Sequence, residues 1–395
     1  MMPLLVWGRR SSAVIIAPIV LVGVALAAWR SAGWQYEWLW GLRNPVSSLP
    51  LVSPLVAAGV AFDTARRWTP LIVGLGPSAR RWRRATLTIP LVHVLWVFGV
   101  FCVIWAAAAV RLNLNDAITR PDGWLPFETF ASLSAAAAVG LIVGRFLPEA
   151  AAPPVAAIGV LATSALSAPL GLTGLFSPVG VRNSAVGLTR DADAAALLIG
   201  LNLALAALCC LLALRGARPS RPWAAAAAVL SAAFLAVLAQ PTTEFEFRPV
   251  AGPTICADQA DVEVCGPQAA EPVLWDLSLA LQQAVDDVTG LPFPPTFELG
   301  LPGVTPPTEP GRAVANVSPA QLNGSERLRT VAGILSLPRI CPQLLEADDD
   351  TTPLLDRQAQ VQTWIELALS TGQATAPAEI QAAYRELLTC RPTRP

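Results

Sequence analysis

The feature that most constrains this fold is a series of long apolar runs in the first 240 residues. The runs lie at 12–29, 46–62, 86–110, 129–147, 153–176, 194–214 and 223–240. A helix rises 1.5 Å per residue, so about 20 apolar residues cross the roughly 30 Å hydrocarbon core of a bilayer. The sequence therefore predicts a polytopic α-helical membrane domain of about seven spans. The second run is the weakest, because Pro45, Pro50 and Pro54 crowd its start.

Arginine counts predict the orientation, because cytoplasmic loops of membrane proteins carry an excess of basic residues. With the N-terminus inside, the inner segments 1–11, 63–85, 148–152 and 215–222, together with Arg145, hold 12 arginines. The outer loops hold six, namely Arg30, Arg43, Arg111, Arg120, Arg182 and Arg190. We therefore expect the N-terminus inside and the tail outside. The aromatic stretch "WQYEWLW" (34–40) fits a belt at the outer interface.

The charges divide the chain into two parts. Charged residues make up only 14% of the chain, against about a quarter in soluble domains. Residues 1–240 hold 18 arginines and 8 acids, whereas residues 241–395 hold 9 arginines and 20 acids. Such asymmetry indicates two environments. We expect a transmembrane domain at 1–240 and an extracytoplasmic α+β domain at 241–395.

Four of the seven cysteines lie in the tail, at Cys256, Cys265, Cys341 and Cys390. An even number in an extracytoplasmic segment predicts two disulfides. Three connectivities satisfy this count, and we favour Cys256–Cys265 with Cys341–Cys390. Four free thiols are the alternative. The tail has no histidine and no CxxC, which argues against a zinc site.

The rest of the tail alternates between strand and helix patterns. "TTEFEFRPV", the 256–265 segment, "PTFELGL" and "GRAVANVS" have the character of strands. Between them, "PVLWDLSLALQQAVDDVTG" places its apolar residues on one helical face and ends at Gly290, a helix-stop residue. Further helices are expected near 319–336, 354–370 and 377–389.

The sequence carries few groups suited to catalysis. There is no lysine, so the chain cannot build a Walker A phosphate loop. Its single histidine, His93, lies inside the third run. An HExxH zinc site is ruled out, because that motif needs two histidines. We expect no enzyme activity, cofactor, metal or nucleic-acid partner. A neutral His93 bonded to a neighbouring helix is the simplest interpretation, with an intramembrane functional group as the alternative.

Two further features of the spans suit helix packing. Gly140 and Gly144 form a GxxxG pair in the fourth run, and Asn202 lies in the sixth. Small residues and neutral polar side chains are common where membrane helices meet. The GxxxG signal is weak in a chain so rich in alanine and glycine.

The segment "DTARRWTPLIVGLGPSARRWRR" (63–84) concentrates basic charge between the second and third runs. Its basic residues and the adjoining tryptophan are Arg66, Arg67, Trp68, Arg80, Arg81, Arg83 and Arg84. Six arginines exceed what orientation alone requires. The apolar island between them suits a short helix on the membrane surface or docking in a groove of a cytoplasmic protein. A plain polybasic loop is the alternative.

The arrangement resembles ABC exporter permeases of the type-2 class, in an uncharacterised branch from high-GC Gram-positive bacteria. "FDTARRW…LGPSARRWRR", "VCGPQAAEPVLWDLSLALQQAVDDVTGLP" and "PAEIQAAYRELLTC" carry the resemblance. Permeases of this class have a coupling helix between the second and third spans, where residues 63–84 lie. The seventh run and the large outer domain depart from the general pattern of the class.

The resemblance implies a subunit of the bacterial cell membrane that forms homodimers or heterodimers. It would bind a separate ATPase through the seven residues of the basic segment. The missing lysine fits a subunit that does not itself hydrolyse ATP. The alternative function is a non-transporting membrane anchor that displays an extracytoplasmic binding, sensing or envelope-assembly domain.

Overall fold

The computed structural model divides the chain into two compact units. It describes residues 11–30, 33–74, 79–167, 176, 185–214, 247–250, 252–300, 312–315, 317–323, 326–339, 341 and 352–391. The first unit comprises 1–115, 121–182 and 190–247, and the second comprises 116–120, 183–189 and 248–395. The second unit thus holds residues 248–395 together with two short segments from the first half of the chain.

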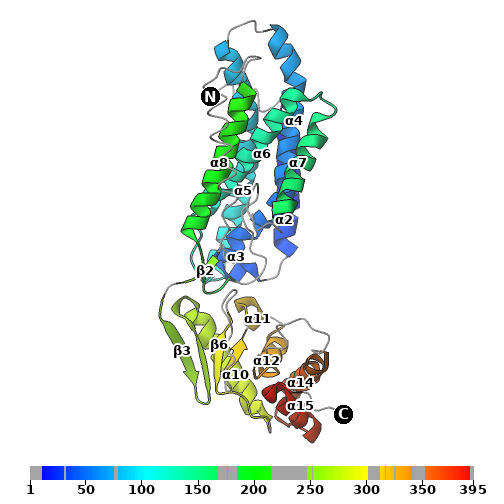
Figure 1. The fold of residues 1–395 in the computed structure, drawn as a ribbon. Helices are drawn as coiled ribbons and strands as arrows, with labels where there is room; N and C mark the ends of the chain where they lie inside the picture. Colours follow the sequence, from blue (N-terminus) through cyan, green and yellow to red (C-terminus); the bar gives the residue numbers. More distant parts are fainter. Residues whose placement is uncertain are drawn as a thin grey trace. The chain divides into compact units, whose positions relative to one another are not determined.

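The first unit is a bundle of apolar helices (Figure 1). Its long helices are α2 (Ala13–Arg30), α4 (Leu49–Gly74), α5 (Ala79–Leu114), α6 (Leu125–Phe146), α7 (Ala152–Ser167) and α8 (Ala192–Leu214). Each coincides with one of the first six apolar runs. The seventh run, 223–240, lies outside the described residues.

Four helical stretches in the described residues are long and apolar enough to cross a membrane: Trp38–Arg67, Leu87–Leu114, Leu125–Phe146 and Ala192–Leu214. Ala13–Ala28 and Ala152–Ala165 are shorter apolar helices. The helical membrane domain is therefore confirmed, whereas the count of seven spans stays a prediction.

The prolines of the second run do not break it. Pro45 begins a 3-10 turn, Pro45–Ser48, after the short helix α3 (Trp38–Arg43), and α4 follows directly at Leu49. Pro50 falls in the first turn of α4, where a missing backbone N–H costs no helical hydrogen bond. The stretch Trp38–Arg67 is therefore long and apolar enough to cross a membrane.

Two sequence expectations were wrong in the first unit. The fifth run is described as helix from Ala152 to Ser167, whereas its last residue, Phe176, is a turn residue with a φ of +63°. Trp34 and Trp40 are buried at 7% and 5% exposure instead of forming an interfacial belt. They belong to the short helical turns that pack against α5.

The GxxxG pair brings α6 into close contact with α4. A Cβ atom on Gly140 would lie 2.3 Å from the carbonyl oxygen of Ala57, and one on Gly144 would lie 2.3 Å from that of Ala61. Each glycine thus faces an alanine, four residues apart on both helices. The two backbones can approach this closely because neither glycine has a side chain.

We expect Gly144→Ala to destabilise the first unit by about 1–3 kcal/mol, because its methyl group forces α6 away from α4. Gly200→Ala in α8 is the matched control, since nothing lies within 4 Å of the Cβ it adds. The measurement is thermal unfolding of both variants in the same detergent. Equal melting temperatures would contradict the close contact.

The second unit is an α+β domain, as expected. Its main sheet has the order β3-β4-β6-β7, formed by Thr254–Gln259, Val262–Pro267, Thr296–Leu299 and Arg312–Ala315. β3 and β4 are an antiparallel hairpin, whereas β4, β6 and β7 run parallel. The helix α10 (Glu271–Asp287) packs on β3 and β4 and ends before Gly290, whose φ is +85°.

Four further helices and a small sheet belong to the described parts of the second unit. They are α11 (Pro319–Asn323), α12 (Arg327–Leu335), α14 (Thr352–Thr371) and α15 (Ala378–Thr389), with a two-stranded sheet of β5 (Val288–Thr289) and β8 (Ala374–Thr375). The helix expected at 319–336 is thus two helices. Of the strand expected at 242–250, the structure describes β2 (Phe247–Pro249), which pairs with β1 (Leu188–Arg190).

The second unit is closed by two disulfides and two loop segments. The disulfides join Cys256 to Cys265 and Cys341 to Cys390, which is the favoured connectivity. Ile118 and Val186, from the loops before α6 and α8, pack against the core of this unit.

Candidate functional site

The basic segment is carried on two helical arms. α4 continues to Gly74 and α5 begins at Ala79, so residues 63–74 and 79–84 are parts of these two long helices. Arg66 is exposed and Arg67 is half-buried. The side chains of Trp68, Arg80, Arg81, Arg83 and Arg84 lie outside the described part.

Asp63 anchors the base of this segment to the start of α2. Its Oδ2 atom accepts hydrogen bonds from Ser11 Oγ at 2.7 Å and from the backbone N of Ser12 at 3.0 Å. These donors precede α2, so the carboxylate acts at the positive end of that helix. Asp63 is only 3% exposed, and a buried carboxylate needs such donors.

His93 joins α5 to the same cluster. Its Nδ1 lies 3.0 Å from the carbonyl oxygen of Ile89, so Nδ1 is the donor. Its Nε2 lies 3.0 Å from Ser12 Oγ and 3.6 Å from Asp63 Oδ2. A catalytic triad needs the serine and the aspartate on opposite ring nitrogens, whereas both face Nε2 here. His93 therefore contacts the residue that precedes α2 and the carboxylate of α4, while its neutral state stays a prediction.

A second buried cluster consists of four charged side chains. Arg43 Nε donates to Asp122 Oδ2 at 2.6 Å, and its Nη2 donates to Glu128 Oε2 at 2.9 Å. Arg190 Nε donates to the other oxygen of Glu128 at 2.8 Å. All four side chains are at most 2% exposed. Glu128 therefore bridges two arginines that are far apart in the sequence.

Phe247 covers both arginines of this cluster. The guanidinium carbons of Arg43 and Arg190 lie 5.2 and 5.5 Å from the centre of its ring. Cations over an aromatic face at this range are attracted by the ring. Phe247 is the first described residue after the seventh run, so the cluster fixes the chain where it leaves the first unit.

The two clusters mark the ends of the apolar span. Arg43 and Asp63 lie on either side of residues 44–62, which contain no charged residue. Arg145 lies near the C-terminus of α6, and its Nη1 donates to the carbonyl of Leu212 at 3.0 Å and to that of Ala213. A cation suits the C-terminus of α8.

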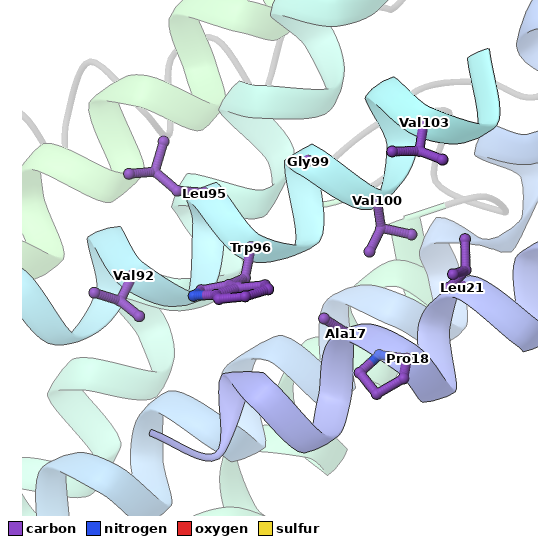
Figure 2. Close-up of a pocket in the computed structure, with 9 residues that line it drawn as sticks. All are labelled: Ala17, Pro18, Leu21, Val92, Leu95, Trp96, Gly99, Val100 and Val103. Carbon is purple, nitrogen blue, oxygen red and sulfur yellow. The ribbon is translucent and has the colours of Figure 1, made fainter. Parts of the chain in front are cut away.

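An apolar groove of about 570 Å³ runs between α2 and α5 (Figure 2). Its lining consists of Ala17, Pro18, Leu21, Val92, Leu95, Trp96, Gly99, Val100 and Val103. Figure 2 shows the Trp96 ring on the side of α5 that faces α2. The lining offers no charged group, so the groove is suited to lipid chains and not to polar chemistry.

Among the described residues, one group of potential ligands lies close enough together to hold a metal ion, and it consists of Cys256, Glu263 and Cys265. The two cysteines form a disulfide, so their thiolates are not available as ligands. Comparison of the chain with protein-family models, with curated proteins and with solved structures finds no match.

Proposed function

We propose that the chain is the membrane subunit of an ABC-type exporter and that it binds a separate ATPase through residues 63–84. The observation that carries the proposal is the pair of helical arms, α4 to Gly74 and α5 from Ala79, with basic residues on both. Helical arms that continue the spans are suited to transmit the movement of a bound partner.

The Asp63 cluster supports this role. Through Ser11, Ser12 and His93, Asp63 connects the base of the arms to α2 as well as α5. A displacement of the arms would therefore reach three helices. The ATP would be hydrolysed by the partner, because this chain has no lysine for a phosphate loop. Two copies, or this chain with a related one, would form the transporter.

The test is capture of an ATPase by the full-length chain from its native membranes in mild detergent. We expect a Walker-motif ATPase to copurify, and charge reversal at Arg80, Arg81, Arg83 and Arg84 to reduce the capture about tenfold or more. Reversal at exposed Arg111 and Arg120 is the matched control. Recovery of no ATPase by the unaltered chain would leave the membrane-anchored binding protein as the better proposal.

We further propose that the chain lies in a bacterial cell membrane and that its second unit is on the extracytoplasmic side. Its two disulfides and its shared core with the 116–120 and 183–189 segments support this location. On intact cells, a charged thiol reagent that cannot cross membranes should label exposed Cys256 after mild reduction and not before. No labelling after reduction, with labelling in lysed cells, would place the tail inside.

A further inference from the structure

One face of the main sheet in the second unit carries the Cys256–Cys265 disulfide together with acidic side chains. Residues two apart on a strand share a face, so Cys256 and Asp258 of β3 lie on the same side of the sheet. Their partners in the antiparallel ladder are Cys265 and Glu263 of β4. Ala257, between the two β3 residues, points the other way into the core, where α10 packs. The cysteines therefore lie on the face that α10 does not cover.

Glu263 adds a third potential ligand atom to the two sulfurs. The Sγ atoms of Cys256 and Cys265 and one carboxylate oxygen of Glu263 all lie within 4.8 Å of one another. On a tetrahedral zinc ion, two sulfurs, or a sulfur and an oxygen, are about 3.6–3.8 Å apart, given Zn–S of about 2.3 Å and Zn–O of about 2.1 Å. Opening the disulfide lets the sulfurs separate to this distance, and a carboxylate shift of about 1 Å completes the group.

The hairpin keeps the two cysteines opposite each other without the disulfide. β3 and β4 are joined by six residue pairs, one of which is Cys256 with Cys265. β4 also pairs with β6 on its other side, and α10 packs on both strands of the hairpin. Directly opposed side chains in an antiparallel pair have their Cβ atoms about 4.5–5.5 Å apart. Two thiols at such positions can therefore bind the same ion.

The charges around the sulfurs favour a divalent cation. Glu263 is half-buried and accepts a long hydrogen bond of 3.5 Å from Thr296 Oγ1. Glu298, which is opposite Cys265 on β6, accepts a hydrogen bond from Arg312 at 2.8 Å, so its charge is already offset. Two thiolates and the Glu263 carboxylate would carry three negative charges next to each other, and a divalent cation offsets most of this charge.

We propose that Cys256, Cys265 and Glu263 form a zinc site once their disulfide is reduced. A dithiol reductant supplies two electrons and two protons to the disulfide and is itself oxidised to a disulfide. The zinc ion then takes the place of the two thiol protons, which are released to the solvent. Thiolate ligands select zinc over magnesium and calcium. Three protein ligands leave the fourth position of the tetrahedral ion for a water molecule.

The test is metal binding by the full-length chain in detergent, without a histidine tag, before and after mild reduction with a phosphine that is then removed under nitrogen. Cys102, Cys209 and Cys210 are first replaced by serine, so that the free thiols of the membrane unit do not bind metal. We expect the reduced chain to show a thiolate-to-cobalt charge-transfer band with Co²⁺, and about one zinc ion per chain to abolish the band. The oxidised chain should show no band.

Two ligand variants and a matched control locate the site. Cys256→Ser should abolish the band, and Glu263→Gln should weaken zinc binding about tenfold or more. Asp258→Asn is the control, because Asp258 is an exposed acid opposite Glu263, and it should change the affinity by about twofold or less.

A band that persists in Cys256→Ser would assign the metal to Cys341 and Cys390 and overturn the proposal. No metal binding by the reduced chain would overturn it as well. Equal zinc affinities of Glu263→Gln and Asp258→Asn would remove Glu263 from the site and so reject the three-ligand arrangement.

Discussion

Glu128→Ala should be among the most damaging single substitutions in this chain. The carboxylate accepts hydrogen bonds from Arg43 Nη2 at 2.9 Å and from Arg190 Nε at 2.8 Å, and both contacts are buried. Its removal leaves two buried guanidinium groups with less compensating charge. Breaking a buried ion pair typically costs about 3–5 kcal/mol. We expect the apparent melting temperature in detergent to fall by about 10 °C at a fixed scan rate.

Glu149→Ala is the control for this prediction, since Glu149 is an exposed acid on the loop after α6. Substitution there should change stability by less than about 0.5 kcal/mol. Glu128→Gln adds a sharper comparison, because it keeps the shape but presents an amide donor to two arginine donors. If Glu128→Gln has the same melting temperature as the unaltered chain, charge compensation by Glu128 is not what stabilises this cluster.

The membrane half shows what hydrophobic pattern predicts and what it misses. Apolar length alone located α2, α4, α5, α6 and α8, because lipid exposure forces a long helix to be apolar. The Phe176 turn was missed, since an apolar run does not reveal where the backbone leaves the helix. Ser53 and Asn202 act on that turn from more than twenty residues away.

The ion cluster was missed for a related reason. Arg43 and Arg190 were counted as loop charges, whereas they are buried against acids 62 to 85 residues distant. One signal was present: the outer segments hold six acids for their six arginines, whereas the inner ones hold two acids for twelve. Balanced charge indicates pairing, but the choice of partners depends on how the helices pack.

Loss of the Cys341–Cys390 disulfide should destabilise the second unit more than loss of Cys256–Cys265. The first bond closes a separation of 49 residues and the second closes nine. Loop-closure entropy then gives costs of about 4 and about 2.6 kcal/mol, respectively. Replacing each pair with alanines and following unfolding of the tail by proteolysis in increasing denaturant measures the difference.

The order of reduction provides an independent measurement of the same contrast. Cys256 is exposed, whereas Cys341 and Cys390 are 0% and 8% exposed. Increasing reductant should therefore open Cys256–Cys265 first, as read by mass tagging of the freed thiols. Simultaneous opening of both bonds at low reductant would contradict the buried position of Cys341 and Cys390.

Tyr384 should report the opening of the Cys341–Cys390 disulfide, because it lies on α15, which ends next to Cys390. It packs edge-to-face on Phe293 with ring centres 5.7 Å apart and is fully buried. Burial raises the pKa of Tyr384, since the phenolate would be desolvated. Loss of Cys341–Cys390 should let α15 detach and Tyr384 ionise at a lower pH, which is measured by tyrosinate absorbance. The Cys256–Cys265 variant should keep the unaltered titration, because that bond joins β3 to β4 and does not hold α15.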